Sequence, residues 1–323
     1  MNFEILSAEY GTKDVKSIVE SHIKDGAIRI TVGNLLFGDP QPFTPKYLNI
    51  RYRLNGIEYT NVIAEETMFN IDPHVEHIPI SCKCITYGRV DFLEESLESF
   101  LRQEYEGDYE LVIVNDYPLQ KLHFDHPKVR VINLDFTFKT IGEKENFAVS
   151  ACKYDTVAVW DDDDLALPNH LQNINKYFPG NELLHWSNAV AFVGSRIASL
   201  QQVGNSGIVY HRNLWMRVGG HAFENAGYDT TFVQKATKAG ARIVRALPSN
   251  DEVSWFYSWG NGSYHMSGLG ADGDGKPNVI VRHSDHIENL RRQGKIPTGD
   301  IELLPHWNQD YKKLLTDYNG KNS

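Results

Sequence analysis

The feature that most constrains the fold is a series of short apolar segments that alternate with helical patterns from Pro79 onward. The apolar segments span residues 80–85, 111–114, 129–134 and 156–160. Strands that are buried on both faces of a parallel sheet read as such near-continuous apolar runs. The alternation therefore predicts an α/β domain with a mainly parallel sheet and helices on both faces.

The helix expected after the first apolar segment has the spacing of a helix with one buried face. Asp91 stands at its start and Glu94 follows three residues later, so we expect Asp91 to cap the helix with Glu94 as its partner. A second helix is expected from Gly142 through Ala151. The apolar face of the first helix consists of Leu93, Leu97, Phe100 and Leu101.

The first 70 residues predict short strands and turns in place of this alternation. Extended patterns cover residues 28–32, 47–53 and 58–63. Asn55-Gly56 between the last two patterns predicts a β-hairpin with a primed turn. This region has no cluster of residues suited to catalysis. It is expected to be an accessory module.

The C-terminal 40 residues show helical spacing again. A short helix is expected to end near Gly294, and a second one carries Trp307, Tyr311, Leu314 and Leu315. We therefore predict four regions along the chain. They are a β-rich module at 1–71, a linker at 72–78, the α/β domain at 79–283 and a helical extension at 284–323.

The charge balance argues against some partners. Lys and Arg number 32 and Asp and Glu number 42, which gives a formal net charge of −10. Proteins that coat DNA or anionic membranes present a basic face, so neither partner is expected. The N-terminus lacks the pattern of a secretory signal, and no apolar run approaches the roughly 20 residues that span a bilayer. Cys82, Cys84 and Cys152 are expected to be buried and reduced in a cytoplasmic protein.

Four consecutive aspartates at residues 161–164 follow one apolar segment and lead into another at 165–168. Neighbouring carboxylates repel one another, and an isolated run of them is usually a solvated turn. Their position between two buried segments favours a bound divalent cation instead. Ligands of open α/β sheets bind beyond the carboxyl ends of the strands, where residues 86–89 and 115–116 are also expected. The pattern indicates a metal site that faces a diphosphate-bearing substrate.

Five motifs follow one another in order: residues 85–89, 112–116, 141–146, 161–168, and Gly219-Gly220 followed by 227–229. Together they resemble the family 2 glycosyltransferases of the GT-A fold over residues 78–265. The resemblance implies an inverting, metal-dependent transfer of a sugar from a nucleoside diphosphate sugar to a hydroxyl of a glycan or another biomolecule. A UDP-sugar is the first candidate for the donor. The implied partners are this donor and acceptor, and a homo-oligomer is left open.

The resemblance also implies roles for individual residues. Asp229 would be the catalytic base, although Tyr228 stands where the family has Glu. Asp229 also stands where a helix is expected to begin, so capping is its other interpretation. Residues that would bind the nucleotide sugar are Thr86, Tyr87, Arg89, Asp116, Gly142, Lys144, Asn146, Asp161 and Asp162.

The resemblance further implies that Asp163 binds Mn²⁺ or Mg²⁺ beneath the diphosphate. A late histidine often completes such a site in GT-A enzymes, and His265 is the first candidate here, ahead of His283 and His286. Residues assigned to the acceptor side are Trp186, His211 and Trp259.

Other interpretations remain at this stage. A sugar-nucleotide pyrophosphorylase would share the layering and the carboxylates, but residues 86–89 match its Gly-rich loop poorly. A degenerate GT-A protein that only binds carbohydrate, and an enzyme that glycosylates modified bases in DNA, are the further alternatives. Residues 3–71 resemble a small β-rich module found at the C-terminus of some mitochondrial DnaJ-like proteins, which implies no activity.

Overall fold

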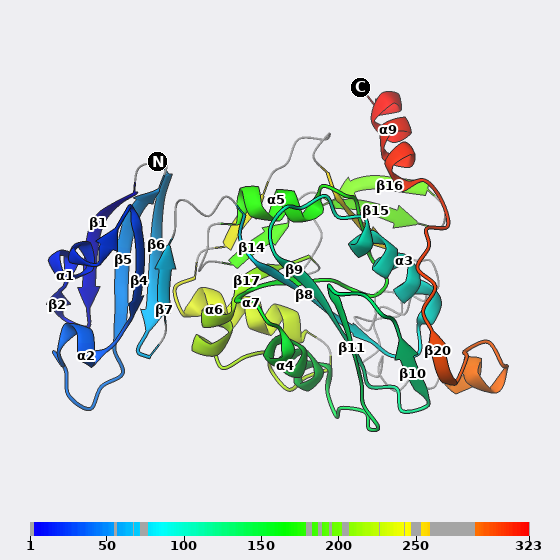
Figure 1. Cartoon of the computed structure of the whole chain (residues 1–323), viewed down its shortest axis with the longest axis horizontal. Helices are drawn as coiled ribbons and strands as arrows, with labels where there is room; N and C mark the ends of the chain where they lie inside the picture. The colour runs from blue at the N-terminus through cyan, green and yellow to red at the C-terminus, as the bar shows by residue number, and fades with distance from the viewer. Residues whose placement is uncertain are drawn as a thin grey trace.

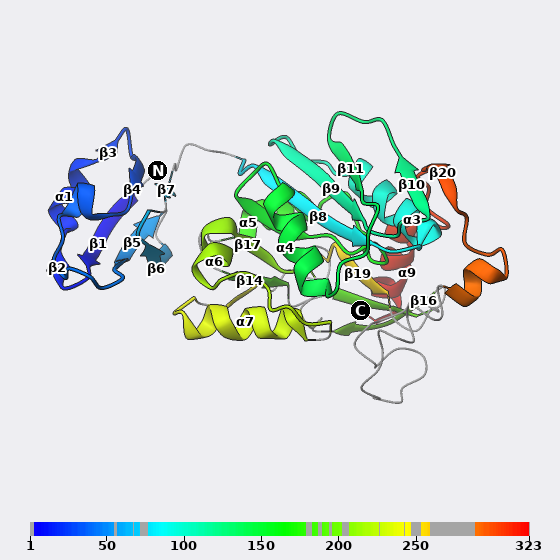
Figure 2. The same cartoon turned by 90° about the horizontal axis from the view of Figure 1, so that it is seen from below.

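The computed structural model describes residues 3–54, 57–66, 68–71, 77–178, 183–186, 189–193, 196–201, 207–225, 227–241, 243–246, 253–258 and 288–322. Figure 1 shows a β-rich module formed by the N-terminal residues beside a larger α/β part. The strands β10 and β20 lie at the end of the α/β part that is far from this module, in both perpendicular views (Figures 1 and 2).

The N-terminal module holds two antiparallel sheets. The predicted hairpin is confirmed, since β5 and β6 pair from Tyr47↔Ala64 to Leu54↔Ile57. The first sheet has the order β2-β1-β5-β6, with β1 Phe3–Tyr10, β2 Lys13–Asp14, β5 Tyr47–Leu54 and β6 Ile57–Ala64. The second has the order β3-β4-β7, with β3 Ile23–Lys24, β4 Ala27–Thr31 and β7 Met68–Ile71. Two short helices, α1 Lys16–Ser21 and α2 Asn34–Phe37, complete the module.

The module has a hydrophobic core of its own. Tyr10, Phe37 and Phe69 are among its fully buried side chains, and all the members of this core lie between Phe3 and Ile71. Burial of apolar area is the main favourable term in folding. The module therefore contains the packing that an independent unit needs.

The α/β part is built on a seven-stranded sheet with the order β11-β9-β8-β12-β17-β14-β18. The strands β11, β9, β8 and β12 are parallel to one another, β17 is antiparallel to both of its neighbours, and β14 and β18 are parallel. The predicted α/β class with a mainly parallel sheet is confirmed. The bounds are β8 Ile80–Thr86, β9 Tyr109–Asn115, β11 Val129–Asn133, β12 Thr156–Val159, β14 Leu183–Trp186, β17 Val209–His211 and β18 Ile243–Ala246.

Helices cover both faces of this sheet because its strands alternate. Leu111 and Ile113 of β9 belong to the core beneath α3 Val90–Leu101 and α5 His170–Tyr177. Val112 and Val114 belong to the core beneath α4, α6 and α7. The bounds of these three helices are Ile141–Ala151, Arg212–Arg217 and Tyr228–Lys238. A smaller sheet, with the order β13-β19-β15-β16, adjoins them and comprises Leu165–Ala166, Trp255–Ser258, Ala189–Val193 and Arg196–Gln201.

The predicted N-cap of α3 is wrong by two residues. Its N-cap is Arg89, which makes no side-chain capping bond, and Asp91 lies within the first turn. Glu94 is not a capping partner either, because its carboxylate accepts a hydrogen bond from the Leu304 N–H at 2.8 Å. The Arg89 side chain is used elsewhere, as described below.

The C-terminal extension contains a strand as well as helices. The predicted turn after the first helix is confirmed, with Gly294 at φ +68°. The strand β20 Gly299–Glu302 then pairs in parallel with β10 Gln120–His123. The final helix, α9 Tyr311–Asn322, begins after Trp307, which the sequence placed within it.

No helix in the described ranges is both long and apolar enough to cross a membrane. The three cysteines are buried and make no disulfide, as predicted.

Candidate functional site

The predicted strand ends lie side by side at one edge of the sheet. Thr86 at the end of β8 pairs with Asn115 at the end of β9, and β12 continues the parallel set on the other side of β8. Because the strands run in the same direction, residues 86–89, 115–117 and 160–164 share this edge. The positions that the sequence proposed for donor binding therefore meet in space.

Arg89 joins the first strand end to the aspartate run. Its Nε donates to Asp162 Oδ2 at 3.1 Å, and a terminal nitrogen donates to the other oxygen of the same carboxylate. The second terminal nitrogen donates to Asp163 Oδ2 at 2.8 Å. Burial opposes the charged form of Arg89, but Asp162 and Asp163 outweigh it and raise the pKa of the guanidinium. A bidentate arginine fixes the orientation of both carboxylates.

Lys144 joins the first two strand ends from the start of α4. Its ammonium donates to the Thr86 carbonyl oxygen at 2.7 Å and to Asp116 Oδ1. The other oxygen of Asp116 accepts from the Phe138 N–H at 3.0 Å. Both residues are buried. Three of the predicted donor-binding residues, Thr86, Asp116 and Lys144, thus form one network.

Burial opposes ionisation of the remaining aspartates, Asp161 and Asp164. Burial, with Asp163 as the next cause, raises the pKa of Asp161 to about 7. Burial also raises the pKa of Asp164 well above its ordinary value. One oxygen of Asp164 accepts from the Ser258 N–H at 2.9 Å, and the other is buried without a hydrogen-bond partner within the described ranges. The edge of the sheet is therefore an electrostatic environment that favours a cation.

Asp229 belongs to the same electrostatic neighbourhood. The hydroxyl of Tyr257 on β19 is close enough to all of these carboxylates to respond to their charge. Its pKa is raised by burial first, and then by the charges of Asp164, Asp161, Asp163 and Asp229. Burial raises the pKa of Tyr228 too, followed by the charges of Glu145, Asp161 and Asp229. The start of α7 thus lies near the aspartate run, although it comes more than 60 residues later.

Asp229 is not the N-cap of α7. The N-cap of α7 is Gly227, in the left-handed region at φ +75°. Asp229 is the second residue of the helix, and its Oδ1 accepts from the Thr230 N–H at 2.7 Å. A helix start holds this carboxylate rigidly and leaves it partly exposed. The helix ends at Lys238, and the Gly240 N–H then donates to the Thr237 carbonyl oxygen at 3.0 Å.

Two of the residues assigned to the nucleotide hold a loop in place. A Cβ on Gly142 would overlap the backbone of Ala222. Asn146 Oδ1 accepts from His221 N at 2.8 Å and from Trp215 Nε1 at 3.0 Å, and its Nδ2 donates to His221 O at 2.9 Å. These contacts fix the segment that leads to α7. The structure gives Asn146 a positioning role.

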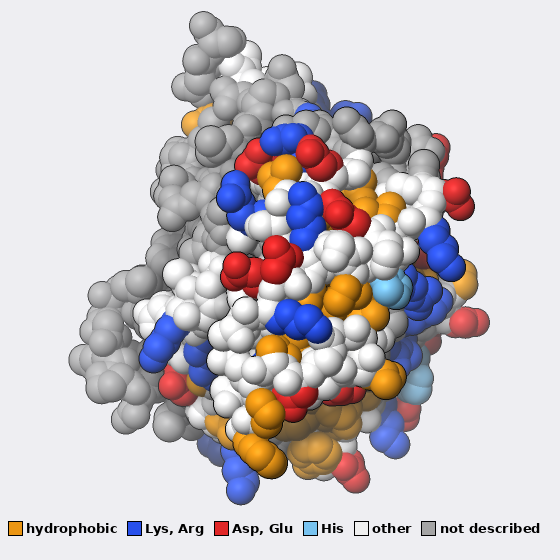
Figure 3. Space-filling view, turned by 90° about the vertical axis from the view of Figure 1, so that its left-hand side faces the viewer, with side chains coloured by type: hydrophobic (Ala, Val, Ile, Leu, Met, Phe, Trp, Pro, Cys, Tyr) orange, Lys and Arg blue, Asp and Glu red, His pale blue; other side chains and the backbone are white. Residues whose placement is uncertain are grey.

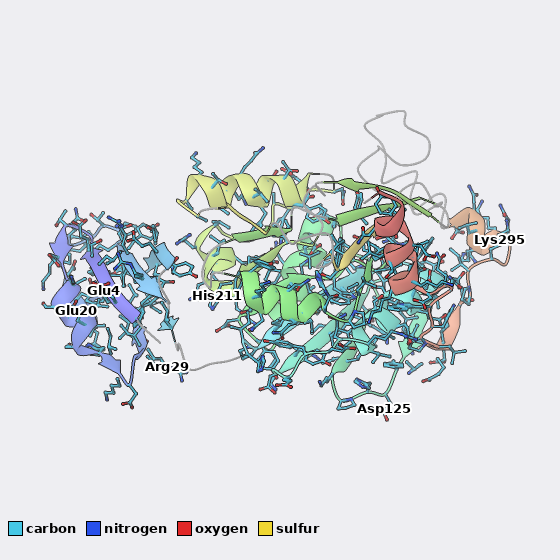
Figure 4. All side chains as sticks on the ribbon, turned by 90° about the horizontal axis from the view of Figure 1, so that it is seen from above. Glu4, Glu20, Arg29, Asp125, His211 and Lys295 are labelled. Carbon is cyan, nitrogen blue, oxygen red and sulfur yellow. The ribbon has the colours of Figure 1, made fainter. Side chains whose placement is uncertain are left out.

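The acceptor-side candidates do not gather at one place. Trp186 ends β14 at the same edge as the aspartates, since β14 is antiparallel to β17 as β12 is. His211 pairs with Thr156 at the start of β12, so it lies at the opposite edge, on the side that faces the N-terminal module (Figure 4). Its Nδ1 accepts from the Asn213 N–H and caps α6. Trp259 and the histidines His265, His283 and His286 lie outside the described residues.

Sequence reasoning missed a buried ion pair beneath the site. Lys83 in the middle of β8 donates to Glu145 of α4, and each side chain is 2% exposed. Glu145 lies within one of the predicted motifs but received no role. An interior lysine in an apolar strand signals a buried partner, although the sequence does not say which residue it is.

An open pocket of about 750 Å³ lies on the outer side of α4. Glu143 and Asn146 of α4 line it, whereas Lys144 and Glu145 point to the sheet. It is therefore distinct from the strand-end site. Its other lining residues are Phe136, Thr137, Phe138, Lys139, Trp215, Met216, Gly219, Gly220 and Phe223.

Residues 83–222 match the family described as "Glycosyl transferase family 2". The chain thus carries a family 2 glycosyltransferase domain, and the predicted GT-A type of α/β fold is confirmed by this match together with the sheet. A curated relative, the "Uncharacterized glycosyltransferase YwdF" of Bacillus subtilis (strain 168), is 32% identical over 111 residues. That alignment covers 33% of this chain and 40% of the relative, so less than half of the relative's length is matched.

Solved structures with a similar arrangement are more distant. TarS 1-349 of S. aureus in complex with UDP-GlcNAc is 16% identical, with a TM-score of 0.44 over 56% of this chain and 58% of that one. The mannosyltransferase PcManGT from Pyrobaculum calidifontis, in complex with GDP-Man and Mn²⁺, is also 16% identical. Its TM-score is 0.46 over 67% of this chain and 70% of that one.

The aspartate run fits a divalent metal of one particular kind. Within the described ranges, no group of three or more His, Cys, Asp or Glu side chains is placed to hold a metal by itself. Mg²⁺ is often held by only one or two carboxylates, with phosphate oxygens of the substrate and water as its other ligands. Asp163 can meet that requirement, since Arg89 engages only one of its oxygens. The residues present thus fit a metal that arrives with a diphosphate.

Proposed function

We propose that this protein is an inverting, metal-dependent glycosyltransferase that moves a sugar from a nucleoside diphosphate sugar to a hydroxyl of an acceptor, with a UDP-sugar as the first candidate for the donor. The observation that carries the proposal is the meeting of the aspartate run, Arg89 and Asp229 at the carboxyl edge of the sheet. This edge combines a cation-binding surface with a separate carboxylate. Those are the two groups that such a transfer needs.

In this proposal Asp163 holds Mn²⁺ or Mg²⁺, with His265 as a second ligand. The metal supplies a Lewis acid that offsets the charge on the departing diphosphate. Arg89 orients Asp163 and contributes a further positive charge beside the phosphates. Asp161 and Asp162 meet the ribose or the sugar, and Thr86, Tyr87, Asp116 and Lys144 lie toward the nucleoside.

Asp229 is the proposed general base. It accepts the proton of the acceptor hydroxyl as that oxygen forms the new bond to the anomeric carbon. The bond from this carbon to the diphosphate oxygen breaks on the opposite face, so configuration inverts in a single displacement. Tyr228 occupies the position before the base in place of the family's Glu, and its hydroxyl lies near Glu145.

We further propose the division into four regions given by the sequence, with an N-terminal module that serves acceptor placement, assembly or partner binding. Its separate core supports this. Its position suits assembly or partner binding, because the module lies on the side of the α/β part that carries His211, at the edge of the sheet opposite the aspartate run (Figures 1 and 4). The resemblance of residues 3–71 to the DnaJ-like module stays a prediction. Three unpaired cysteines suit a cytoplasmic protein.

A panel of nucleotide sugars with and without Mn²⁺ tests the main proposal by thermal shift. A ligand at about 100 times its Kd stabilises the native state by about 2.7 kcal/mol, so a cognate donor stands out. Asp163→Asn should abolish the part of the shift that needs Mn²⁺. Asp125→Asn, at the exposed loop labelled in Figure 4, is the matched control and should retain it.

Turnover then separates the alternatives. Donor binding without transfer or hydrolysis of any donor would favour a degenerate binding protein over an enzyme. Transfer to glycosylatable bases in duplex DNA would redirect the choice of acceptor. A chain shortened to begin near Asp72 should still bind the donor and hydrolyse it slowly, but lose efficient transfer to the acceptor or its oligomeric state. Loss of both activities would contradict the separate role of the module.

A further inference from the structure

The C-terminal segment reaches the strand ends at which the donor nucleoside is proposed to bind. Its helical turn closes where Lys295 N donates to the Leu290 carbonyl oxygen at 2.9 Å. Ile296 follows and is buried against Tyr117, the residue directly after Asp116. Leu290 and Tyr87 pack at the margin of the same cluster. Residues 290–296 therefore cover the nucleoside end of the site.

Two tyrosines from neighbouring strand ends meet beneath this segment. Tyr87 follows β8 and Tyr117 follows β9, and their ring centroids lie 4.8 Å apart at an interplanar angle of 57°. Tyr117 is 4% exposed, whereas Tyr87 is partly exposed. Aromatic side chains at such a position offer a face on which a flat base can stack.

The segment is held firmly from the side of β10. Gln120 Nε2 donates to the Pro297 carbonyl oxygen at 2.7 Å, and Gly299 N donates to the Leu119 carbonyl oxygen at 2.8 Å. The parallel ladder of β10 and β20 continues to His123↔Glu302. The wall over Tyr117 is thus part of the folded domain and is in place before a ligand arrives.

The hydroxyl of Tyr117 is buried and has no hydrogen-bond partner within the described ranges. A buried hydroxyl without a partner costs free energy, which a ligand that bonds to it would recover. Burial raises the pKa of this hydroxyl, and Arg291, Glu288 and Tyr87 are the charged and titratable groups that act on it. Each oxygen of its neighbour Asp116 already accepts a hydrogen bond, from Lys144 and from the Phe138 N–H.

The distance across the sheet suits a nucleotide with its base at Tyr117 and its phosphates at the aspartate run. Neighbouring strands lie about 4.8 Å apart, and β8 separates β9 from β12, so Tyr117 stands about 10 Å from the aspartate run in that direction. A nucleoside diphosphate with its phosphates at Asp163 extends by about this length. Its base would then reach the two tyrosines.

We propose that Tyr117 and residues 290–296 form the nucleobase wall of the donor site, with the Tyr117 hydroxyl bonding to an edge of the base. This inference rests on the proposed function. It assigns the C-terminal extension a part in choosing the nucleotide, through Leu290 and Ile296 that hold the Tyr117 ring in place. Tyr117 is a binding residue in this scheme, and Ile296 is a positioning residue.

Calorimetry on the full chain with Mn²⁺ tests it. The probes are UDP, GDP, ADP and CDP, and pyrophosphate serves as a ligand without a base. Tyr117→Phe removes only the hydroxyl, so it should weaken the tightest-binding nucleotide about tenfold and leave pyrophosphate unchanged. Ile296→Ala should reduce the preference among the four nucleotides. Ile301→Ala, in the adjoining strand β20 and packed against the main core, is the matched control and should leave that preference unchanged.

The outcomes separate this inference from the function beneath it. Unchanged nucleotide affinity in Tyr117→Phe would overturn the inference and leave the proposed function standing. Equal loss of nucleotide and pyrophosphate would also overturn it, because the residue would then act only on the fold. If the unaltered chain binds none of the four nucleotides, the proposed function fails together with the inference.

Discussion

The N-terminal module and the α/β part place their charges in opposite ways. In the module, Arg53 bridges Glu4 and Glu58, both at 2.6 Å, on the surface. Lys46 is buried there, but its partners Asp39 and Glu65 remain partly exposed. Figure 3 shows Lys, Arg, Asp and Glu side chains interspersed over this end of the molecule. Water screens these charges, so they contribute little to stability.

The α/β part, besides exposed ion pairs such as that of His123 with Asp300, keeps several charged groups inside. Lys83 pairs with Glu145, Lys144 with Asp116, and Arg89 with two aspartates, all in or beside the core. Taking such groups out of water costs free energy, which their mutual attraction often fails to recover. The location of the ion pairs therefore indicates that the two parts have different roles. One is built to fold, and the other also keeps costly charges where a ligand would use them.

The largest expected effect is the loss of sugar transfer when the carboxylate of Asp229 is removed. Asp229→Asn keeps the size of the side chain and its local hydrogen bond but cannot accept a proton. Transfer should fall by about 10²-fold or more, with donor affinity little changed, because only the transition state uses this group. Steady-state kinetics with the donor found by thermal shift, together with its Kd, would measure this.

Asp155→Asn is the matched control for that experiment. Asp155 lies at the other edge of the sheet, where it pairs with Arg212 at 3.3 Å. This variant should retain full transfer. Near-normal turnover in Asp229→Asn would show that the base lies elsewhere and would remove one side of the comparison.

The second prediction concerns the interior pair. Lys83→Met leaves Glu145 buried without its cation and should lower the free energy of unfolding by about 3–5 kcal/mol. Urea unfolding followed by Trp fluorescence measures the α/β part alone, since the first tryptophan of the chain is Trp160. The double variant Lys83→Met, Glu145→Leu should recover most of the loss. If Lys83→Met lowers the free energy of unfolding no more than a surface substitution does, the buried pair does not distinguish the α/β part from the module.

The third prediction is a pH dependence confined to the α/β part. Burial lowers the pKa of His221 to about 4, from an ordinary value near 6.5. The unfolded chain therefore binds more protons between these values, so this contribution is complete above pH 6.5 and is lost as pH falls through 4. It amounts to about 3 kcal/mol.

Burial lowers the pKa of His170 to about 3 and adds to the same trend, whereas the raised pKa values of Asp161 and Asp164 act in the opposite sense. The contribution of His221 is therefore measured as the difference in urea midpoint, followed by Trp fluorescence, between His221→Phe and the unaltered chain. This difference should grow in favour of the variant from pH 7 to pH 4.5, because Phe does not titrate and its ring can keep the contact with Phe232. Parallel slopes for this variant and the unaltered chain would rule out His221 as a source.

The smallest effect is expected at the surface of the module. Arg53→Ala removes both exposed ion pairs, and it should leave the unfolding midpoint indistinguishable from that of the unaltered chain. Salt should likewise have no effect on the difference between the two chains. A clear loss of stability would show that the module depends on its surface charges after all.

Much of this architecture could be predicted because hydrophobic periodicity determines it. The four parallel strands and the helix after Asp229 show that periodicity directly. The strand β1 escaped prediction because a bulge between Ile5 and Ser7 breaks its alternation. The strand β20 escaped because its pairing comes from backbone hydrogen bonds, with Ile301 as its single apolar side chain.

The site divided in the same way. The aspartate run, Asp116 and Lys144 could be proposed because each lies in a local motif at a strand end. The pairing of Lys83 with Glu145 could not, since 62 positions separate them and nothing local links the two. Tyr117 was missed for a similar reason, because its significance comes from Ile296 at the far end of the chain.

The parallel pairing of β10 with β20 affects how the chain can fold during synthesis. Gln120 is bonded to a residue 177 positions further along the chain. During synthesis, β8, β9 and β12 can assemble while β10 still waits with an open edge. Contacts between such distant segments form late in folding. A nascent chain should therefore possess its aspartates well before it can hold a nucleoside, and an edge exposed for that long is where a chaperone would be expected to bind.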